Sequence, residues 1–378
     1  MEFDFYSPVR FVFGRPVADA LPGALAPLGA RRLLLLSDPG LQRIGLVDQV
    51  GGLLHDGGWE IAVFAQVKTT PTVGDVEAAL AVAQAAGVQA LVALGGGSVI
   101  DVGKAVGLLM TNPGSYADYQ WRGQPVLQPI LPLVAVPTTA GTGSEMTRVM
   151  VIEDEETHSK RGVLSPHLFA RAAVVDPHLT LSLPPKLTAA TGADVLGHAL
   201  EAYVGRRANP VTDALALAAL RRAWRSLPHA TRQGSDLAAR SGMALASSLA
   251  GMAFDQSGLG IIHALAGPLA AQYGLHHGLC VGLLLPSGLK YNLPVLADRR
   301  AGLLEALGLP LSLPDSDVVE EIRSWLQALG LPLTLRELDI LEPDLSALAE
   351  GASHMAMMPN NPRPATAEDC KGILEELL

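Results

Sequence analysis

Short apolar runs that each end in small or polar residues restrict the fold of the first half of this chain more than any other feature. Three of them are RRLLLLSD (31–38), VQALVALGGGS (88–98) and LPLVAVPTTAGTGSE (131–145). Between the first two lies VEAALAVAQAAG (76–87), an Ala-rich stretch typical of a helix that ends at a glycine. This alternation of strands and helices predicts an α/β domain whose parallel sheet is covered on both faces.

The second half of the chain has a different character, and two prolines in SLPPK (182–186) mark the change. Beyond them the strand-like runs end. Segments such as TAATGADVLGHALEAYVG (188–205) have the spacing and the Ala and Leu content of helices. We therefore predict two domains, an α/β domain over residues 1–183 and an all-α domain over residues 184–378.

Composition disfavours several classes of protein. No run of about 18 apolar residues is free of charge, glycine and proline, which disfavours a membrane span. The start, MEFDFYSPVR, lacks the basic and apolar regions of a signal peptide, and Cys280 and Cys370 are too few for a disulfide scaffold. The net charge of −10 disfavours non-specific binding to nucleic acid or anionic membranes. We expect a cytoplasmic protein.

The glycine-rich segment VALGGGSVIDVGKAV (92–106) follows an apolar run and opens a helix, as phosphate-binding loops do. It matches neither common template. Five residues separate Gly97 from Gly103, one more than a Walker loop has, and Ile100 stands where the dinucleotide fingerprint requires glycine. The N–H groups at a helix start can still hold an anion, and Ser98 is well placed as the helix N-cap. The alternative is a tight turn that requires glycine.

Two further features lie at the ends of predicted strands, where open parallel sheets bind their ligands. One is the loop PTTAGTGSE (137–145), which is rich in hydroxyl groups and small residues. The other is Asp38, which ends the run RRLLLLSD. An acid there can accept hydrogen bonds from both hydroxyls of an adenosine ribose and would repel a 2′-phosphate. An ordinary helix N-cap before Pro39 is the alternative interpretation of Asp38.

Histidines and one aspartate gather in the helical half. Asp194 and His198 stand four residues apart, so they share a helix face and could bind one metal ion. GIIHALAGPLAAQYGLHHGLC (260–280) adds His263, His276 and His277. A plain Asp–His hydrogen bond and a buried core histidine are the alternatives. Carboxylate and imidazole without thiolate suit a borderline divalent ion such as iron(II) or zinc, which would act as a Lewis acid on a substrate oxygen.

Four motifs, GGGSVIDVGKA, PTTAGTGSEMT, TGADVLGHALEAY and GLGIIHALAGPL followed by HHG, occur in order. With them the chain resembles the iron-containing (group III) alcohol dehydrogenase family over nearly its whole length. The resemblance implies a Rossmann-like NAD-binding α/β domain and a helical domain that holds a divalent metal ion in the cleft. It implies the metal ligands Asp194, His198, His263 and His277. It also implies a dinucleotide site made of Asp38, Gly96, Gly97, Ser98, Thr138, Thr139, Thr142, Thr147 and Lys160, which Asp101 supports.

The chain departs from the family pattern at three places. Gly267 stands where many members have a histidine four residues after the third ligand, and His276 stands where proline is common before the last ligand. The choice of His277 over His276 as ligand therefore rests on alignment with the glycine that follows. Thr70 precedes Pro71 where Asn-Pro is usual, so an adenosine contact is altered. Lys104 is left as a helix residue with no assigned contact.

We expect reversible hydride transfer between a primary alcohol and NAD to give an aldehyde, with Fe²⁺ or Zn²⁺ as the metal and a homo-oligomeric protein. Phe254 is expected either to line the substrate pocket or to lie in the helix core, and His276 is a candidate proton relay. Related alternatives are a maleylacetate reductase and a zinc polyol dehydrogenase of the glycerol type. A lyase like 3-dehydroquinate synthase would form no net NADH. A binding protein without activity is disfavoured, because four buried ligand residues are costly to keep without a metal.

Overall fold

The computed structural model describes residues 2–155, 159–341 and 343–378. The chain divides into two compact units. The α/β unit comprises Ser7–Thr139 and Gly143–Thr180, and the helical unit comprises Met1–Tyr6, Ala140–Thr142 and Leu181–Leu378. The division into domains 1–183 and 184–378 stays a prediction.

A six-stranded sheet forms the centre of the α/β unit, and all its neighbouring strands run parallel in the order β1-β8-β5-β4-β2-β3. The central strands β2, β4 and β5 are apolar almost throughout because both faces of a parallel sheet are buried. The strands are β1 (Arg10–Phe13), β2 (Arg32–Leu36), β3 (Glu60–Phe64), β4 (Ala90–Gly95), β5 (Leu133–Pro137) and β8 (Ala172–Val175).

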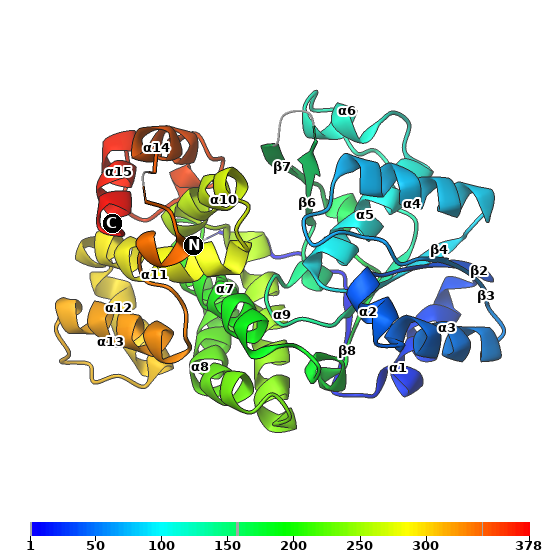
Figure 1. The fold of residues 1–378 in the computed structure, drawn as a ribbon, viewed down its shortest axis with the longest axis horizontal. Helices are drawn as coiled ribbons and strands as arrows, with labels where there is room; N and C mark the ends of the chain where they lie inside the picture. Colours follow the sequence, from blue (N-terminus) through cyan, green and yellow to red (C-terminus); the bar gives the residue numbers. More distant parts are fainter. Residues whose placement is uncertain (1, 156–158, 342) are drawn as a thin grey trace. The chain divides into compact units, whose positions relative to one another are not determined.

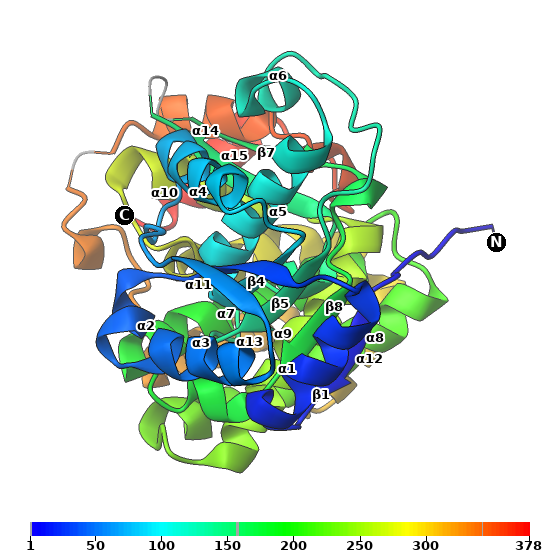
Figure 2. The same ribbon diagram turned by 90° about the vertical axis from the view of Figure 1, so that its right-hand side faces the viewer.

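Alternate residues of the central strands enter two separate cores, because successive side chains of a strand point to opposite faces. Leu34 and Leu36 of β2 pack in the core beneath α4 and α5, whereas Leu33 and Leu35 pack in the core beneath α1 and α3. Figure 2 shows these two helix layers on either side of the sheet. The helices are α1 (Val17–Leu25), α3 (Leu46–Asp56), α4 (Val73–Ala85) and α5 (Gly97–Thr111).

The α/β unit also carries two short helices and an antiparallel hairpin. The helices are α2 (Pro39–Arg43) and α6 (Tyr116–Gln120). The hairpin joins β6 (Val149–Asp154) to β7 (Ser159–Leu164).

The helical unit is built around α7, which packs against α8, α9 and α11 (Figure 1). Residues Thr188–Val204 of α7 are all buried, as expected of a helix with neighbours on every side. Gly197 permits the close approach of α11, because a Cβ there would lie 2.4 Å from Val281 Cγ1. The helices are α7 (Pro185–Val204), α8 (Pro210–Arg232), α9 (Leu237–Ser257), α10 (Ile261–Tyr273), α11 (His277–Asn292), α12 (Ala297–Leu307), α13 (Asp315–Ala328), α14 (Leu345–Ser353) and α15 (Ala367–Glu375).

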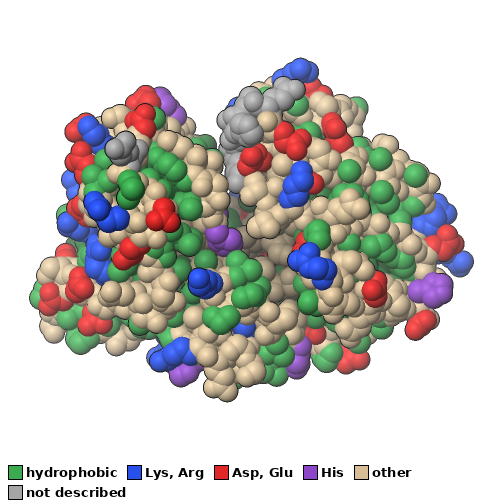
Figure 3. All heavy atoms as spheres, in the orientation of Figure 1, with side chains coloured by type: hydrophobic (Ala, Val, Ile, Leu, Met, Phe, Trp, Pro, Cys, Tyr) green, Lys and Arg blue, Asp and Glu red, His purple; other side chains and the backbone are tan. Residues whose placement is uncertain are grey.

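The predicted fold class, a parallel α/β part followed by a helical part, is confirmed. Among the residues that the structure describes, no helix has the length and apolar character needed to cross a membrane. On the face of the molecule seen in Figure 3, acidic and basic side chains are interspersed.

Candidate functional site

The strand order of the sheet reverses between β2 and β4. β3 lies on one side of β2, whereas β4, β5 and β8 follow on the other. Crevices at such a reversal, outside the carboxyl ends of the strands, are where open α/β sheets bind ligands. Asp38 follows the end of β2, and Gly96 follows the end of β4. The Ser37 hydroxyl joins the two strand ends by donating a 2.8 Å hydrogen bond to the Leu94 carbonyl.

Asp38 is the N-cap of α2. Its Oδ1 accepts hydrogen bonds from the amides of Gly40, at 2.8 Å, and Leu41, at 3.0 Å. The N-cap interpretation of this residue is thus confirmed. The carboxylate has a second oxygen, Oδ2, and the side chain is half-buried. Its contact with a ribose stays a prediction.

Helix α5 begins two residues earlier than the sequence predicted. The N-cap is Gly96, and the prediction of Ser98 as N-cap was wrong because Ser98 already lies inside the helix. The Ser98 hydroxyl donates instead to the Thr69 carbonyl at 2.6 Å. A Cβ at Gly96 would lie 3.3 Å from Thr139 Oγ1, so the two strand-end loops approach closely there. The first N–H groups of this 15-residue helix have no intrahelical partners, and they lie beside both loops.

Lys104, to which the sequence analysis assigned no contact, is fully buried in α5. Its Nζ donates to the Ser144 carbonyl at 2.7 Å and to the hydroxyls of Ser144 and Thr147, each at 3.1 Å. The Val149 carbonyl in β6 also accepts from it at 2.7 Å, so the three protons are shared among four acceptors. Lys104 therefore fastens the loop after β5 and the start of the hairpin to α5.

Asp101 lies one turn before Lys104 and supports the same loop. Its carboxylate accepts from the Ser144 hydroxyl at 2.5 Å and from the Val151 amide at 2.9 Å. Burial raises the pKa of Asp101, and the positive charge of Lys104 opposes that shift. The supporting role that the resemblance implied for Asp101 accords with these contacts.

The remaining residues of the predicted dinucleotide site are spread over both units. Thr138 is buried, and its amide donates to Gly95 at the end of β4, at 3.0 Å. Thr147 is buried with its hydroxyl bonded to Lys104. Thr142 belongs to the helical unit. The side chain of Lys160 lies outside the described residues. Nucleotide contacts of these residues stay predictions.

In the helical unit, α7, α10 and α11 bring three predicted metal ligands together. One ligand atom each from Asp194, His263 and His277 lies within 4.8 Å of the others. The Oδ1 atom of Asp194 lies 3.4 Å from His263 Nε2 and 3.8 Å from His277 Nε2. His263 and His277 follow Asp194 by 69 and 83 positions in the sequence, and the fold brings both rings to the Asp194 carboxylate.

His198 lies at the edge of this group. Its Nδ1 is 3.8 Å from Asp194 Oδ1, and its ring stacks between Phe254 and His263 with centroid distances of 4.3 and 4.5 Å. Phe254, half-buried, thus forms one wall of the cluster. His276 is the N-cap of α11 and is not part of the three-residue group, which contains its neighbour His277.

The cluster fits a bound cation. Asp194 Oδ1, His198 Nδ1 and His263 Nε2 are buried, and among the described residues they have no hydrogen-bond partner. Buried polar atoms without partners are costly, and one ion bound by all of them would remove that cost. The donors are oxygen and nitrogen only, a set that suits iron(II) or zinc.

Burial and neighbouring charges set the ionisation of these groups. Burial raises the pKa of Asp194, but the adjacent histidines outweigh it and the pKa is lowered overall. Burial lowers the pKa of His198 to about 3 despite the carboxylate beside it. Burial also acts to lower the pKa of His263, but Glu201 and Asp194 raise it to about 9. An ionised carboxylate and a neutral imidazole are the forms that bind metals.

The sequence analysis missed Glu201. Its Oε2 lies 2.6 Å from His263 Nδ1, on the side of the ring away from Asp194. A signal was present in the sequence, because Glu201 follows Asp194 by seven positions and His198 by three, which places all three on one face of α7.

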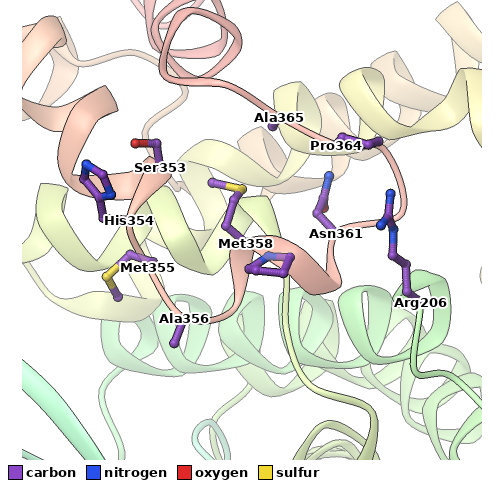
Figure 4. A pocket seen from close by; sticks show the side chains of 10 residues that line it. Arg206, Ser353, His354, Met355, Ala356, Met358, Asn361, Pro364 and Ala365 are labelled. Carbon is purple, nitrogen blue, oxygen red and sulfur yellow. The ribbon is translucent and has the colours of Figure 1, made fainter.

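A pocket of about 430 Å³ is lined by Arg206, from the loop between α7 and α8, and by residues from the end of α14 to Ala365. Figure 4 shows its lining, which mixes polar and apolar side chains and includes Arg206, Met355, Met358 and Asn361. The Met355 methyl is also the atom nearest to Gly267, 3.5 Å from where a Cβ would stand. The position that the family pattern gives to a histidine is thus faced by a methionine.

Comparison with known proteins gives matches over nearly the whole chain. A family model for iron-containing alcohol dehydrogenase matches residues 8–177, and one for the Fe-containing alcohol dehydrogenase family, C-terminal, matches residues 188–378. The NAD-dependent methanol dehydrogenase of Bacillus methanolicus is 34% identical over 99% of this chain and 100% of its own length. The long-chain-alcohol dehydrogenase 1 of Geobacillus thermodenitrificans is 39% identical over 98% of this chain and 95% of its own.

A crystal structure of a 1,3-propanediol oxidoreductase has the same fold, with a TM-score of 0.94, 36% identity and full coverage of both chains. The match includes both the parallel sheet and the helical unit. These comparisons, together with the Asp and His cluster, show that the chain is an NAD-dependent enzyme of the iron-containing alcohol dehydrogenase family.

Proposed function

We propose that this enzyme interconverts a primary alcohol and its aldehyde, with Asp194, His198, His263 and His277 as the ligands of one iron(II) ion. The observation that carries the ligand set is the group of buried, unpartnered atoms on Asp194, His198 and His263. A metal ion bound there would supply Lewis acidity toward a substrate oxygen. NAD would supply or accept the hydride.

Residues of the chain suit one site to a metal ion and the other to NAD. In the helical unit, the Asp194 carboxylate is ionised and the His198 ring is neutral, so both are ready to bind a cation. In the α/β unit, the amides at the start of α5 would bind the diphosphate of NAD. Asp38 would accept hydrogen bonds from the ribose hydroxyls through its second oxygen, and its negative charge would repel the 2′-phosphate of NADP.

We propose an alcohol or aldehyde without a charged group as the substrate. The ring of Phe254 covers one side of the cluster, and Met355 faces Gly267, one turn after His263 in α10. Apolar walls favour an alkyl chain. The relatives act on methanol, long-chain alcohols and 1,3-propanediol by name, so the chain length is left to experiment.

The test is to purify the protein anaerobically with iron(II) and follow NADH absorbance with short alcohols and aldehydes. We expect reversible NADH formation, and His263→Ala should lose both the metal and the turnover. Absence of turnover with iron, zinc, cobalt and nickel would contradict the proposal. Consumption of a substrate without net NADH formation would favour the lyase alternative instead.

A further inference from the structure

We propose that Glu201 is a positioning residue of the metal centre, which fixes the tautomer of His263 and the start of α10 together. The inference rests on the proposed ligand set. Glu201 is almost fully buried, with 1% of its surface exposed, and both of its oxygens accept hydrogen bonds from α10. It therefore supports a ligand and is not one itself.

The first contact sets the tautomer. Glu201 Oε2 lies 2.6 Å from His263 Nδ1. A carboxylate can only accept hydrogen bonds, so a neutral His263 must carry its proton on Nδ1. The Nε2 lone pair is then free to point toward Asp194 Oδ1, 3.4 Å away. Carboxylates that accept the second N–H of a histidine ligand fix its orientation and strengthen its binding to metal.

The second contact sets the backbone that carries His263. The N-cap of α10 is Gly260, which has no side chain to cap the helix. Glu201 Oε1 accepts from the Ile262 amide at 2.6 Å, and Asn361 Oδ1 accepts from the Ile261 amide at 3.2 Å. Two side chains from other segments thus replace the missing cap, and a negative charge at a helix start is favourable.

Close packing at the start of α10 makes the arrangement specific. A Cβ at Gly260 would lie 2.7 Å from Asn361 Oδ1 and 3.1 Å from Glu201 Oε1, so a side chain there would displace these acceptors. The same Asn361 lines the pocket of Figure 4. Helix α7 supplies Asp194 and His198, and it also supplies Glu201, which supports the third ligand, His263.

The test compares Glu201→Gln with Asn361→Ala. Glutamine keeps the size of the side chain but has one acceptor oxygen, and its amide nitrogen can only donate. If that nitrogen faces His263, the ring must accept at Nδ1 and carry its proton on Nε2, where it cannot bind a metal. Asn361→Ala removes the other cap of α10, together with the hydrogen bonds of Asn361 to Asn292 and to the Arg363 carbonyl, and leaves the contact between Glu201 and the ring intact. It therefore measures the cost of disturbing this helix start without loss of the carboxylate.

We expect zinc affinity, measured by competition with a chelator, to fall roughly 10–100-fold in E201Q and by only a few-fold in N361A. Nitrogen NMR of the metal-free proteins, at a pH where His263 is neutral, should show its proton on Nδ1 in the wild type and on Nε2 in E201Q. Glu201→Asp, which keeps the carboxylate, should recover affinity relative to E201Q.

Unchanged affinity in E201Q, or an equal loss in N361A, would overturn the role of Glu201. If E201Q does not fold, E201D provides the test instead. A loss of zinc affinity in E201D while His263 keeps its proton on Nδ1 would equally contradict the proposal. A wild-type protein that binds no metal would show that the ligand set itself is wrong. The NMR comparison distinguishes the two failures, because it reads the tautomer without a metal.

Discussion

The Lys104 ammonium lies 2.7 Å from the carbonyl oxygen of Ser144, and this lysine is fully buried in the α/β unit. A buried lysine is stable only if its charge is paired and its three protons find acceptors. Here the acceptors belong to the loop after β5 and to β6, and the Asp101 carboxylate is close enough for its pKa to be affected. The position of the second strand-end loop thus depends on one side chain of the glycine-loop helix.

Lys104→Met should lower the free energy of unfolding by about 3–5 kcal/mol, the usual cost of removing one partner from a buried, charged network. Methionine fills a similar volume but leaves the carbonyls of Ser144 and Val149 without this donor and removes the positive charge near Asp101. Urea unfolding followed by circular dichroism measures the change. Lys186→Met is the control, because Lys186 is exposed in the first turn of α7 and its loss should change stability by less than about 0.5 kcal/mol. Equal effects of the two substitutions would contradict the structural role of Lys104.

Metal binding should raise the melting temperature of the wild type. A ligand that binds only the folded state at 100 times its Kd adds about 2.7 kcal/mol of stability. His263→Ala should abolish the increase, because it removes one of the three grouped ligands. His354→Ala, at an exposed position bonded to Glu350, should keep it. The measurement is thermal unfolding with and without zinc, and a stabilised His263→Ala protein would show that the ligand set is wrong.

Close packing of α11 on α7 gives a third prediction. A Cβ at Gly278 would lie 2.3 Å from the Ala190 carbonyl oxygen, so Gly278→Ala must push the start of α11, and His277 with it, away from α7. We expect a loss of about 1–3 kcal/mol in stability from this overpacking, and a lower zinc content after dialysis. Gly372→Ala in α15 is the matched control. Among the described residues, no heavy atom outside the neighbouring helix backbone lies within 4 Å of its Cβ position, so alanine should stabilise the helix by up to about 1 kcal/mol.

Much of the fold was predictable because the sequence of a buried parallel strand is a continuous apolar run. β2, β4 and β5 are the clearest examples, and each lies inside a run identified from sequence. The hairpin β6–β7 was not predicted, because VMVIED and SKRGVL mix charged and apolar residues without a clear alternation. The hairpin is held in part by Lys104, a tertiary contact that local patterns do not contain.

The candidate site was predictable only where residue type and spacing are both unusual. Asp194 and His198 stand four apart in a chain with ten histidines, and His263 is one of few polar residues in an apolar helix. Glu201 belongs to a set of 37 acidic residues, and only its burial and its contact with His263 distinguish it. The N-cap at Gly96 was missed because a serine two positions later is the better cap by residue type.

The two cysteines should be inert in the folded protein. Cys280 and Cys370 are buried thiols outside any disulfide, and burial raises the pKa of Cys370 to about 11. The thiolate is the reactive form, so at pH 8 only about a thousandth of Cys370 would be reactive. Iodoacetamide labelling followed by mass spectrometry should find neither cysteine modified in the native state and both modified in urea. Rapid labelling of Cys370 in the native protein would contradict its burial.

Asp38 offers a test that separates structure from cofactor choice. Asp38→Asn keeps an acceptor for the amides of Gly40 and Leu41, and therefore keeps the cap of α2, but it loses the charge. Asp38→Gly loses both. A hydrogen bond to a charged group contributes about 1.5–3 kcal/mol, so the ratio of kcat/KM for NAD over NADP should fall about tenfold or more in both variants. Only Asp38→Gly should also lower the melting temperature. An unchanged ratio in Asp38→Asn, with the cap intact, would show that Asp38 serves α2 and not the ribose.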